Sequence, residues 1–122
     1  MLLNNFFTIT QQIKNDSNID SQISLNAEHP IYKGHFPHQP VLPGVCMMQI
    51  LAELTGHALG REVLIKKAGQ VKFLIPIIPQ KFPNLEVKIE CISAEDGSLK
   101  ITGSIHAAEL TFFKFKGLFL MC

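Results

Sequence analysis

The chain has 122 residues, with 11 Lys and Arg against 10 Asp and Glu, 47% hydrophobic residues and 17% charged residues. This length suits one domain with a modest core, so we expect a single domain over residues 1–122. The composition excludes a disordered chain and a coiled coil. A formal net charge of +1 creates no field that would attract nucleic acid or an anionic membrane surface, so neither is an expected partner.

Cysteine usage and the N-terminus indicate an expected location. Cys46, Cys91 and Cys122 show neither CxxC nor zinc-ligand spacing, which favours reduced structural thiols in a cytoplasmic protein and no metal site. The first residues have no basic region followed by an apolar run, so no signal peptide is expected. No apolar stretch reaches the ~18 residues of a membrane span.

The first half of the chain predicts a hairpin, a loop and a helix. Strands are expected at residues 6–14 and 19–27, joined by a polar turn. The prolines between His29 and Gly44 predict a segment without regular structure. An apolar helix follows, with Pro43 in its first turn and Gly60 at its C-terminal end.

The second half predicts only strands, at residues 63–75, 85–93, 99–107 and 110–121. Asp96-Gly97 is a strong hairpin signal between two of them. The adjacent Phe112 and Phe113 break strict alternation, which suggests that one of them faces an interface. Because no βαβ alternation is present, the expected fold is α+β, with one antiparallel sheet curving around one long apolar helix.

Gln49, Glu53 and His57 follow one another at i, i+4 and i+8 on the otherwise apolar helix. This spacing places them in one row. The row indicates a lined cavity or a subunit boundary, and the alternative is that the three side chains simply face solvent.

The segment from Gly34 to Val45 combines a histidine, stiffening prolines and a helix start. The prolines restrict the loop that carries His35, and the helix start offers the free N–H groups of Gly44 and Val45. A base beside such donors can remove a proton next to a carbonyl group or activate water against a thioester. The alternative is an ordinary hydrogen-bonded loop histidine before a helix.

These residues resemble a known family. Gly34 to Pro37 (GHFP), Pro40-Val41 and Pro43 to Val45 (PGV) are similar to the hallmark of the hotdog-fold 3-hydroxyacyl-[acyl-carrier-protein] dehydratases of fatty-acid synthesis, and the resemblance covers nearly the whole chain. It implies a hotdog fold and removal of water from a (3R)-hydroxyacyl thioester to give the trans-2-enoyl thioester. No bound cofactor is implied, because the substrate is carried on the phosphopantetheine of an acyl carrier protein.

The resemblance also implies roles for individual residues. His35 matches the catalytic base and Gly44 matches the N–H donor to the thioester carbonyl. The family's helix carboxylate, contributed by the other subunit, falls on Gln49, which is the main departure of this chain, and Glu53 stands one turn further on. We expect Gln49 and Glu53 to complete the catalytic set. The residues expected along the substrate are Phe36, Pro37, Val45 and Met48.

The implied assembly is a homodimer or a larger oligomer of dimers, with a heterodimer with a homologue also open. A positive segment formed by Arg61, Lys66, Lys67 and Lys72 is a candidate contact for the acidic carrier protein. Two other functions remain open because of Gln49. One is an acyl thioesterase of the hotdog superfamily, and the other is a noncatalytic partner subunit of an active homologue.

Overall fold

The computed structural model describes residues 2–33 and 40–122, and within them the chain forms six strands, one α-helix and one short 3₁₀ helix. The elements are β1 (Phe7–Asn15), β2 (Asn18–Leu25), η1 (Pro30–Lys33), α1 (Gly44–Leu59), β3 (Val63–Phe73), β4 (Asn84–Ser93), β5 (Leu99–Ala107) and β6 (Leu110–Met121). All predicted strands and the helix are present. The prediction that residues 29–44 hold no regular structure is wrong at η1, whose single turn Pro30 can start because a first-turn proline needs no N–H partner.

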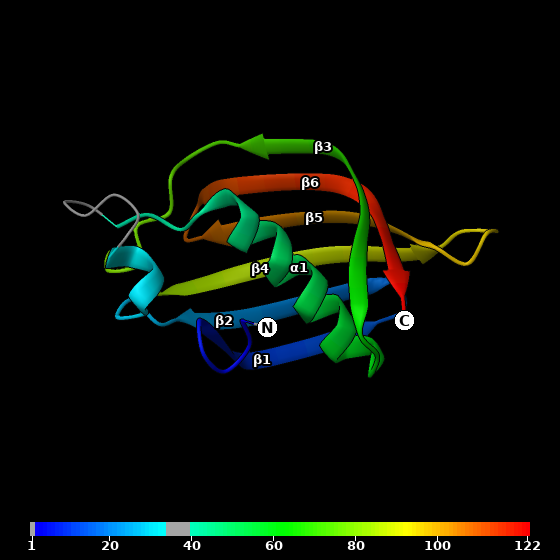
Figure 1. Ribbon diagram of the computed structural model, residues 1–122, viewed down its shortest axis with the longest axis horizontal. Helices are drawn as coiled ribbons and strands as arrows, with labels where there is room; N and C mark the ends of the chain where they lie inside the picture. The colour runs from blue at the N-terminus through cyan, green and yellow to red at the C-terminus, as the bar shows by residue number, and fades with distance from the viewer. Residues whose placement is uncertain (1, 34–39) are drawn as a thin grey trace.

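The strands make one antiparallel sheet in the order β1-β2-β4-β5-β6-β3. The sheet curves around α1, which lies across its inner face (Figure 1). Three of the pairings are hairpins between neighbours in the chain, whereas β2–β4 and β3–β6 join distant segments. This is the expected architecture of one sheet around one helix.

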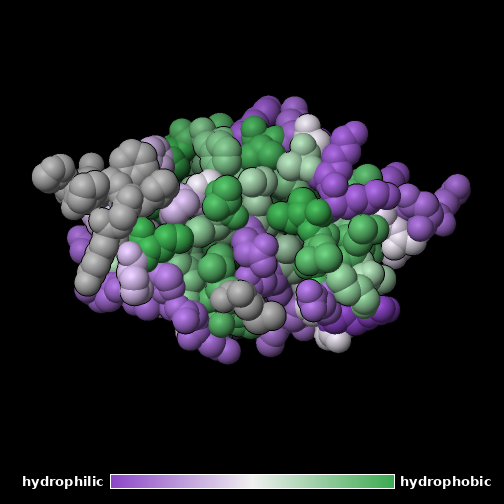
Figure 2. Space-filling model, in the orientation of Figure 1, coloured by the Kyte–Doolittle hydropathy of each residue, from purple (hydrophilic) through white to green (hydrophobic). Residues whose placement is uncertain are grey.

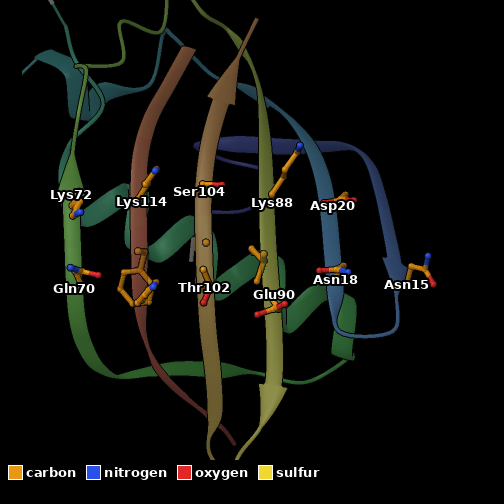
Figure 3. A pocket seen from close by; sticks show the side chains of 14 residues that line it. Asn15, Asn18, Asp20, Gln70, Lys72, Lys88, Glu90, Thr102, Ser104 and Lys114 are labelled. Atoms are coloured by element: carbon orange, nitrogen blue, oxygen red, sulfur yellow. The ribbon is translucent and has the colours of Figure 1, made fainter. Parts of the chain in front are cut away.

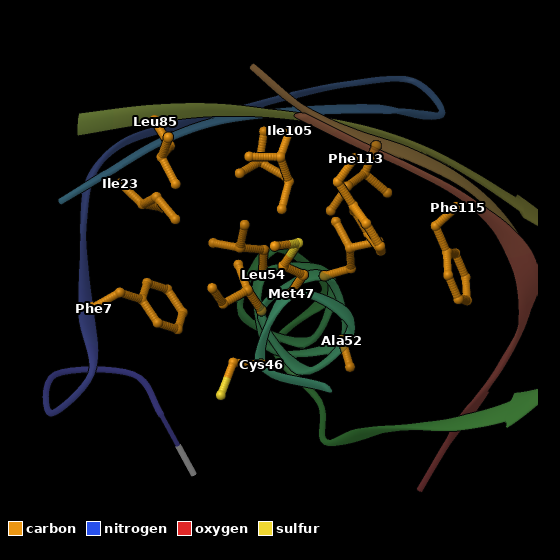
Figure 4. Close-up of a cluster of buried hydrophobic side chains, with 14 of the residues drawn as sticks. Phe7, Ile23, Cys46, Met47, Ala52, Leu54, Leu85, Ile105, Phe113 and Phe115 are labelled. Atoms are coloured by element: carbon orange, nitrogen blue, oxygen red, sulfur yellow. The ribbon is translucent and has the colours of Figure 1, made fainter. Parts of the chain in front are cut away.

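Alternation along the strands directs apolar side chains to the helix. Ile101, Gly103 and Ile105 of β5 face α1, while Thr102 and Ser104 point away from it. Figure 4 shows Met47 and Leu54 of the helix facing Ile23, Leu85, Ile105 and Phe113 of the sheet. Gly103 permits a close approach, because a Cβ there would lie 2.9 Å from Leu51 Cδ1. The core is therefore a single layer between helix and sheet.

Both ends of α1 have defined backbone geometry. Gly60 has φ 69° and its N–H donates to Gly56 O, as a left-handed C-terminal residue does. Pro43 precedes the helix as its extended N-cap, one residue earlier than predicted. Proline has no side-chain acceptor, so no side chain of this residue caps the helix start.

Phe112 and Phe113 are both fully buried, so the suggestion that one of them faces an interface is wrong for the single chain. Phe113 packs in the core beside Phe73 and Phe115. Phe112 is covered by Phe82, whose ring centroid lies 5.1 Å away. The connection between β3 and β4 therefore covers the aromatic ring that alternation alone would expose.

The edge strand β3 is the most exposed strand of the sheet. Eight of its eleven residues are exposed, and they include Leu64 and Phe73. In Figure 2, the face that carries α1 shows large hydrophobic areas with a hydrophilic patch among them. No helix within the described residues is long and apolar enough to cross a membrane.

Candidate functional site

The start of α1 opens into an apolar pocket of about 310 Å³. Its walls are Val41, Leu42, Pro43, Gly44, Met47, Phe73, Ile75 and Pro76. The helix forms the floor of this pocket. The end of β3 and the segment after it form one side. The pocket thus brings an aliphatic wall to a helix N-terminus.

Gly44 lies directly beneath the ring of Phe73. A Cβ at Gly44 would be 2.8 Å from both Cε1 and Cζ of that ring, which is closer than real Cβ atoms come. Phe73 itself remains 56% exposed, and its ring centroid lies 5.3 Å from that of Phe113. The absence of a side chain at position 44 therefore lets an aromatic ring lie over the helix start.

The helix start also provides hydrogen-bond donors. The N–H groups of Cys46 and Met47 both donate to Pro43 O, at 3.0 and 3.2 Å. No described residue accepts a bond from the N–H of Gly44 or Val45. Among the described residues, two donors and the positive end of the helix dipole are therefore left for a carbonyl oxygen.

The polar row of α1 lies in a second pocket, of about 520 Å³. Gln49, Glu53 and His57 all line it, together with Leu3 and Arg61. Gln49 and Glu53 are half-buried, and His57 is exposed. The row therefore lines a cavity, as one of the two interpretations of the sequence expected.

Glu53 is held by donors on both sides. Its Oε1 accepts bonds from the N–H groups of Leu2 and Leu3 at 2.9 and 2.7 Å, and its Oε2 accepts from Leu2 at 2.9 Å. Gln49 Nε2 donates to Oε2 at 2.8 Å. Sequence reasoning missed Leu2 and Leu3, because backbone donors have no sequence signal.

This bonding determines which end of the Gln49 amide faces Glu53. A carboxylate only accepts hydrogen bonds, so the NH₂ group must be the end that touches it. Gln49 Oε1 is left pointing elsewhere as an acceptor. The exchange of Gln and Glu relative to the family pattern thus produces an oriented carboxamide instead of a free acid.

Gly44 and Gln49 line separate pockets of the same protomer. Five helical residues correspond to a rotation of about 140° beyond one full turn and a rise of about 7.5 Å. The two residues therefore face different sides of α1.

The remaining predicted site residues are placed as follows. His35, Phe36 and Pro37 lie outside the described residues. Val45 is 69% exposed beside the first pocket, and Met48 is half-buried against the core. Met47 lines the pocket instead of Met48.

Comparison with known proteins places the chain in a dehydratase family. A family model described as ApeI-like, ApeI dehydratase, matches residues 11–111. A 3-hydroxyacyl-[acyl-carrier-protein] dehydratase FabZ of Xanthomonas oryzae pv. oryzae (strain PXO99A) is 31% identical over 103 residues, covering 74% of this chain and 67% of the relative. The corresponding protein of Histophilus somni (strain 2336) is 33% identical over 88 residues. That match covers 66% of this chain and spans 57% of the relative's length.

Solved structures show the same fold. The dehydratase heterocomplex ApeI:P from Xenorhabdus doucetiae aligns with a TM-score of 0.69 at 22% identity, covering 90% of this chain and 95% of that chain. A hypothetical thioesterase from Streptococcus pneumoniae TIGR4, solved with coenzyme A, aligns with a TM-score of 0.64 at 11% identity, covering 98% of this chain and 90% of that chain. At these identities the structures establish the hotdog fold alone.

The family match covers most of the chain and agrees with the sheet topology and the GHFP and PGV motifs. The chain belongs to the ApeI-like dehydratase family of hotdog-fold proteins.

Proposed function

We propose that the chain, as a single hotdog domain in the cytoplasm, is the subunit of a dehydratase that converts a (3R)-hydroxyacyl thioester on an acyl carrier protein into the trans-2-enoyl thioester. The observation that carries the proposal is the pocket at the start of α1. There the N–H group of Gly44, which no described residue accepts, lies beside an apolar wall that suits an acyl chain, and the N–H group of Val45 follows it in the same helix start. Family membership supplies the reaction class.

The thioester carbonyl accepts a hydrogen bond from the Gly44 N–H. This bond and the helix dipole stabilise the negative charge that develops on the carbonyl oxygen when the α-proton leaves. His35 takes that proton, the electron pair forms the C2–C3 double bond, and the C3–O bond breaks. The imidazolium then returns the proton to the departing hydroxyl group, so one water leaves and His35 is restored.

Gln49 replaces the family's acid with an acceptor. Its Oε1, turned away from Glu53, receives a hydrogen bond from the 3-hydroxyl group and holds the C3–O bond in line for elimination. Because Gly44 and Gln49 face different pockets, the Gln49 at each site comes from a second subunit. The exposed edge of β3 is the surface at which two subunits join.

The test is mass spectrometry of intact carrier-protein thioesters. Incubation with a 3-hydroxyacyl thioester should remove one water, and incubation with the 2-enoyl thioester should add one.

H35A should abolish both reactions. G44A should reduce kcat/KM by about tenfold or more, because a Cβ displaces Phe73 and crowds the carbonyl site. H57A is the matched control on the same helix and should turn over as the parent does.

A noncatalytic partner subunit is the second candidate, and Gln49 favours it because a carboxamide cannot supply a proton. Q49E distinguishes the two. Gain of dehydration by Q49E from an inactive parent would establish the partner role, since the rest of the site would then be intact. Release of a free thiol by the parent would overturn both candidates in favour of a thioesterase.

A further inference from the structure

The face of the sheet turned away from α1 carries a groove of about 660 Å³. Two cross-strand rows of polar side chains line it. The first row runs Asp20, Lys88, Ser104, Lys114, Lys72, and the second runs Asn18, Glu90, Thr102, Lys116, Gln70. Figure 3 shows the labelled members of both rows side by side across the sheet. This surface faces away from the helix and from both pockets of the candidate site.

Positive charge is concentrated at one end of the groove. Lys72 and Lys114 are directly opposite each other in the β3–β6 pairing, and Lys116 lies on the same face two residues further along β6. Like charges directly opposite across strands are unfavourable. Within residues 2–33 and 40–122 none of these three lysines forms an ion pair, whereas Lys88 pairs with Glu86 at 3.5 Å.

Hydroxyl groups border the three lysines. Thr102 lies opposite Lys116, and Ser104 lies opposite Lys114. Ser104 Oγ is 2.6 Å from His106 Nε2, and His106 Nδ1 is 3.1 Å from Thr111 Oγ1. Ser104 and His106 are both half-buried, so this chain of contacts holds the Ser104 hydroxyl in place at the groove.

We propose that this groove binds a soluble phosphate ester, with its phosphate between Lys72, Lys114 and Lys116 and within reach of the Ser104 hydroxyl. Lysine ammonium groups bind phosphate as point charges, and an anion placed there removes the repulsion of the opposed lysines. Asp20 and Glu90 at the far end of the groove repel a second phosphate and suit hydroxyl or amino groups on the rest of the ligand. The ligand is therefore anionic at one end and a hydrogen-bond donor at the other.

Inorganic pyrophosphate is the probe, titrated by calorimetry and by amide chemical shifts of the full chain. We expect saturable binding, with shifts centred on residues 102–104 and 114–116. K72Q/K114Q should weaken binding by about tenfold or more. The double variant should fold, because it removes two opposed like charges from exposed positions. Its melting curve verifies this.

K81Q/K100Q is the matched control, because it removes the same charge from lysines that do not line the groove. It should bind pyrophosphate within about twofold of the parent. If both double variants lose the same pyrophosphate affinity, the loss reflects net charge alone and the proposed site is overturned. The absence of saturable binding to the parent would overturn it too. Binding of phosphatidic-acid vesicles or of an acidic carrier protein without any binding of pyrophosphate would overturn it as well, in favour of a docking surface.

Discussion

At the scale of single residues, Glu53 connects the helix to the N-terminal segment. The carboxylate accepts bonds from Leu2, Leu3 and Gln49, and Phe6 just beyond is fully buried. Family resemblance suggests Glu53 as a displaced catalytic acid, and these contacts give it a structural role as well. It holds residues 2–6 against α1 and sets the orientation of the Gln49 amide.

Replacing Glu53 by Ala should destabilise the chain by about 2 kcal/mol, because three N–H donors lose a charged acceptor in a half-buried site. Hydrogen exchange should rise at residues 2–6 while the centre of the sheet stays protected. Thermal unfolding and exchange mass spectrometry measure the two effects. H57A, on the same face but exposed, should leave both unchanged. If residues 2–6 exchange as slowly in E53A as in the parent, Glu53 does not hold this segment against α1.

Part of the candidate site follows from sequence and part does not. Gly44 and the row of Gln49, Glu53 and His57 could be predicted, because motif and helical spacing are local properties. Phe73 over Gly44 and the amides of Leu2 and Leu3 at Glu53 could not, since each contact joins segments that only the folded sheet brings together.

At the scale of elements, the β3–β6 pairing depends on Gly117. A Cβ at this position would fall on the carbonyl oxygen of Lys67 and lie 2.7 Å from Phe115 Cζ. Irregular register in β3 on either side of Lys67 and Ala68 brings the two backbones this close. No side chain fits there without separating the strands.

G117A should therefore destabilise the protein by about 2–3 kcal/mol, through overpacking against backbone that cannot rotate away. Exchange should increase along β3 more than along β4 and β5. Chemical denaturation with exchange mass spectrometry tests this. T102A, an exposed change on the neighbouring strand, is the control. If the free energy of unfolding of G117A lies within about 0.5 kcal/mol of the parent's, β3 and β6 adjust freely to the added methyl group.

The turn between β4 and β5 is held by Asp96. Its Oδ1 accepts bonds from Ser98 Oγ and Ser98 N at 2.6 and 3.0 Å. These bonds, with a smaller contribution from Lys66, lower the pKa of Asp96 to about 2. Because the folded pKa lies below the ordinary value of 3.8, the stabilisation is complete above about pH 4 and is lost as pH falls through about 2.

S98A should raise the pKa of Asp96 towards 3.8, because it removes the larger of the two bonds. A carboxyl-carbon NMR titration from about pH 1 to about pH 6, which includes both expected values, measures the shift. K66Q should move the pKa less, since Lys66 contributes less. A larger shift in K66Q than in S98A would reverse this order of causes.

The elements themselves were largely predictable, and the pairings only in part. Alternation and turn residues predicted the hairpins β1–β2 and β4–β5, since neighbours in the chain pair through short turns. The β2–β4 and β3–β6 pairings depend on packing around α1, which no local signal encodes. The burial of Phe112 could not be predicted for the same reason. Alternation places its side chain on the outer face of the sheet, where Phe82 from a distant segment covers it.

At the scale of the whole molecule, β3 presents an unpaired edge with Leu64, Lys66, Lys67, Lys72 and Phe73 exposed. Such an edge favours association through another strand. Two copies of β3 paired antiparallel would place lysines of both copies close together.

A homodimer through β3 should therefore tighten between about 0.05 and 0.5 M salt, because screening weakens the repulsion between lysines. Pairing with an acidic strand of a homologue should weaken over the same range. Sedimentation equilibrium measures both. A homodimer that dissociates as salt rises would show that opposite charges, not like charges, face each other across the β3–β3 interface.

The β2–β4 pairing described above also constrains how the molecule assembles in time. Residues 26–83, which include α1 and β3, must be looped out before β2 can join β4. Closing a long loop costs entropy before any contact of that pairing compensates for it, which slows folding. On the ribosome the backbone edge of β2 that pairs with β4 stays unpaired until β4 has emerged, although α1 emerges earlier.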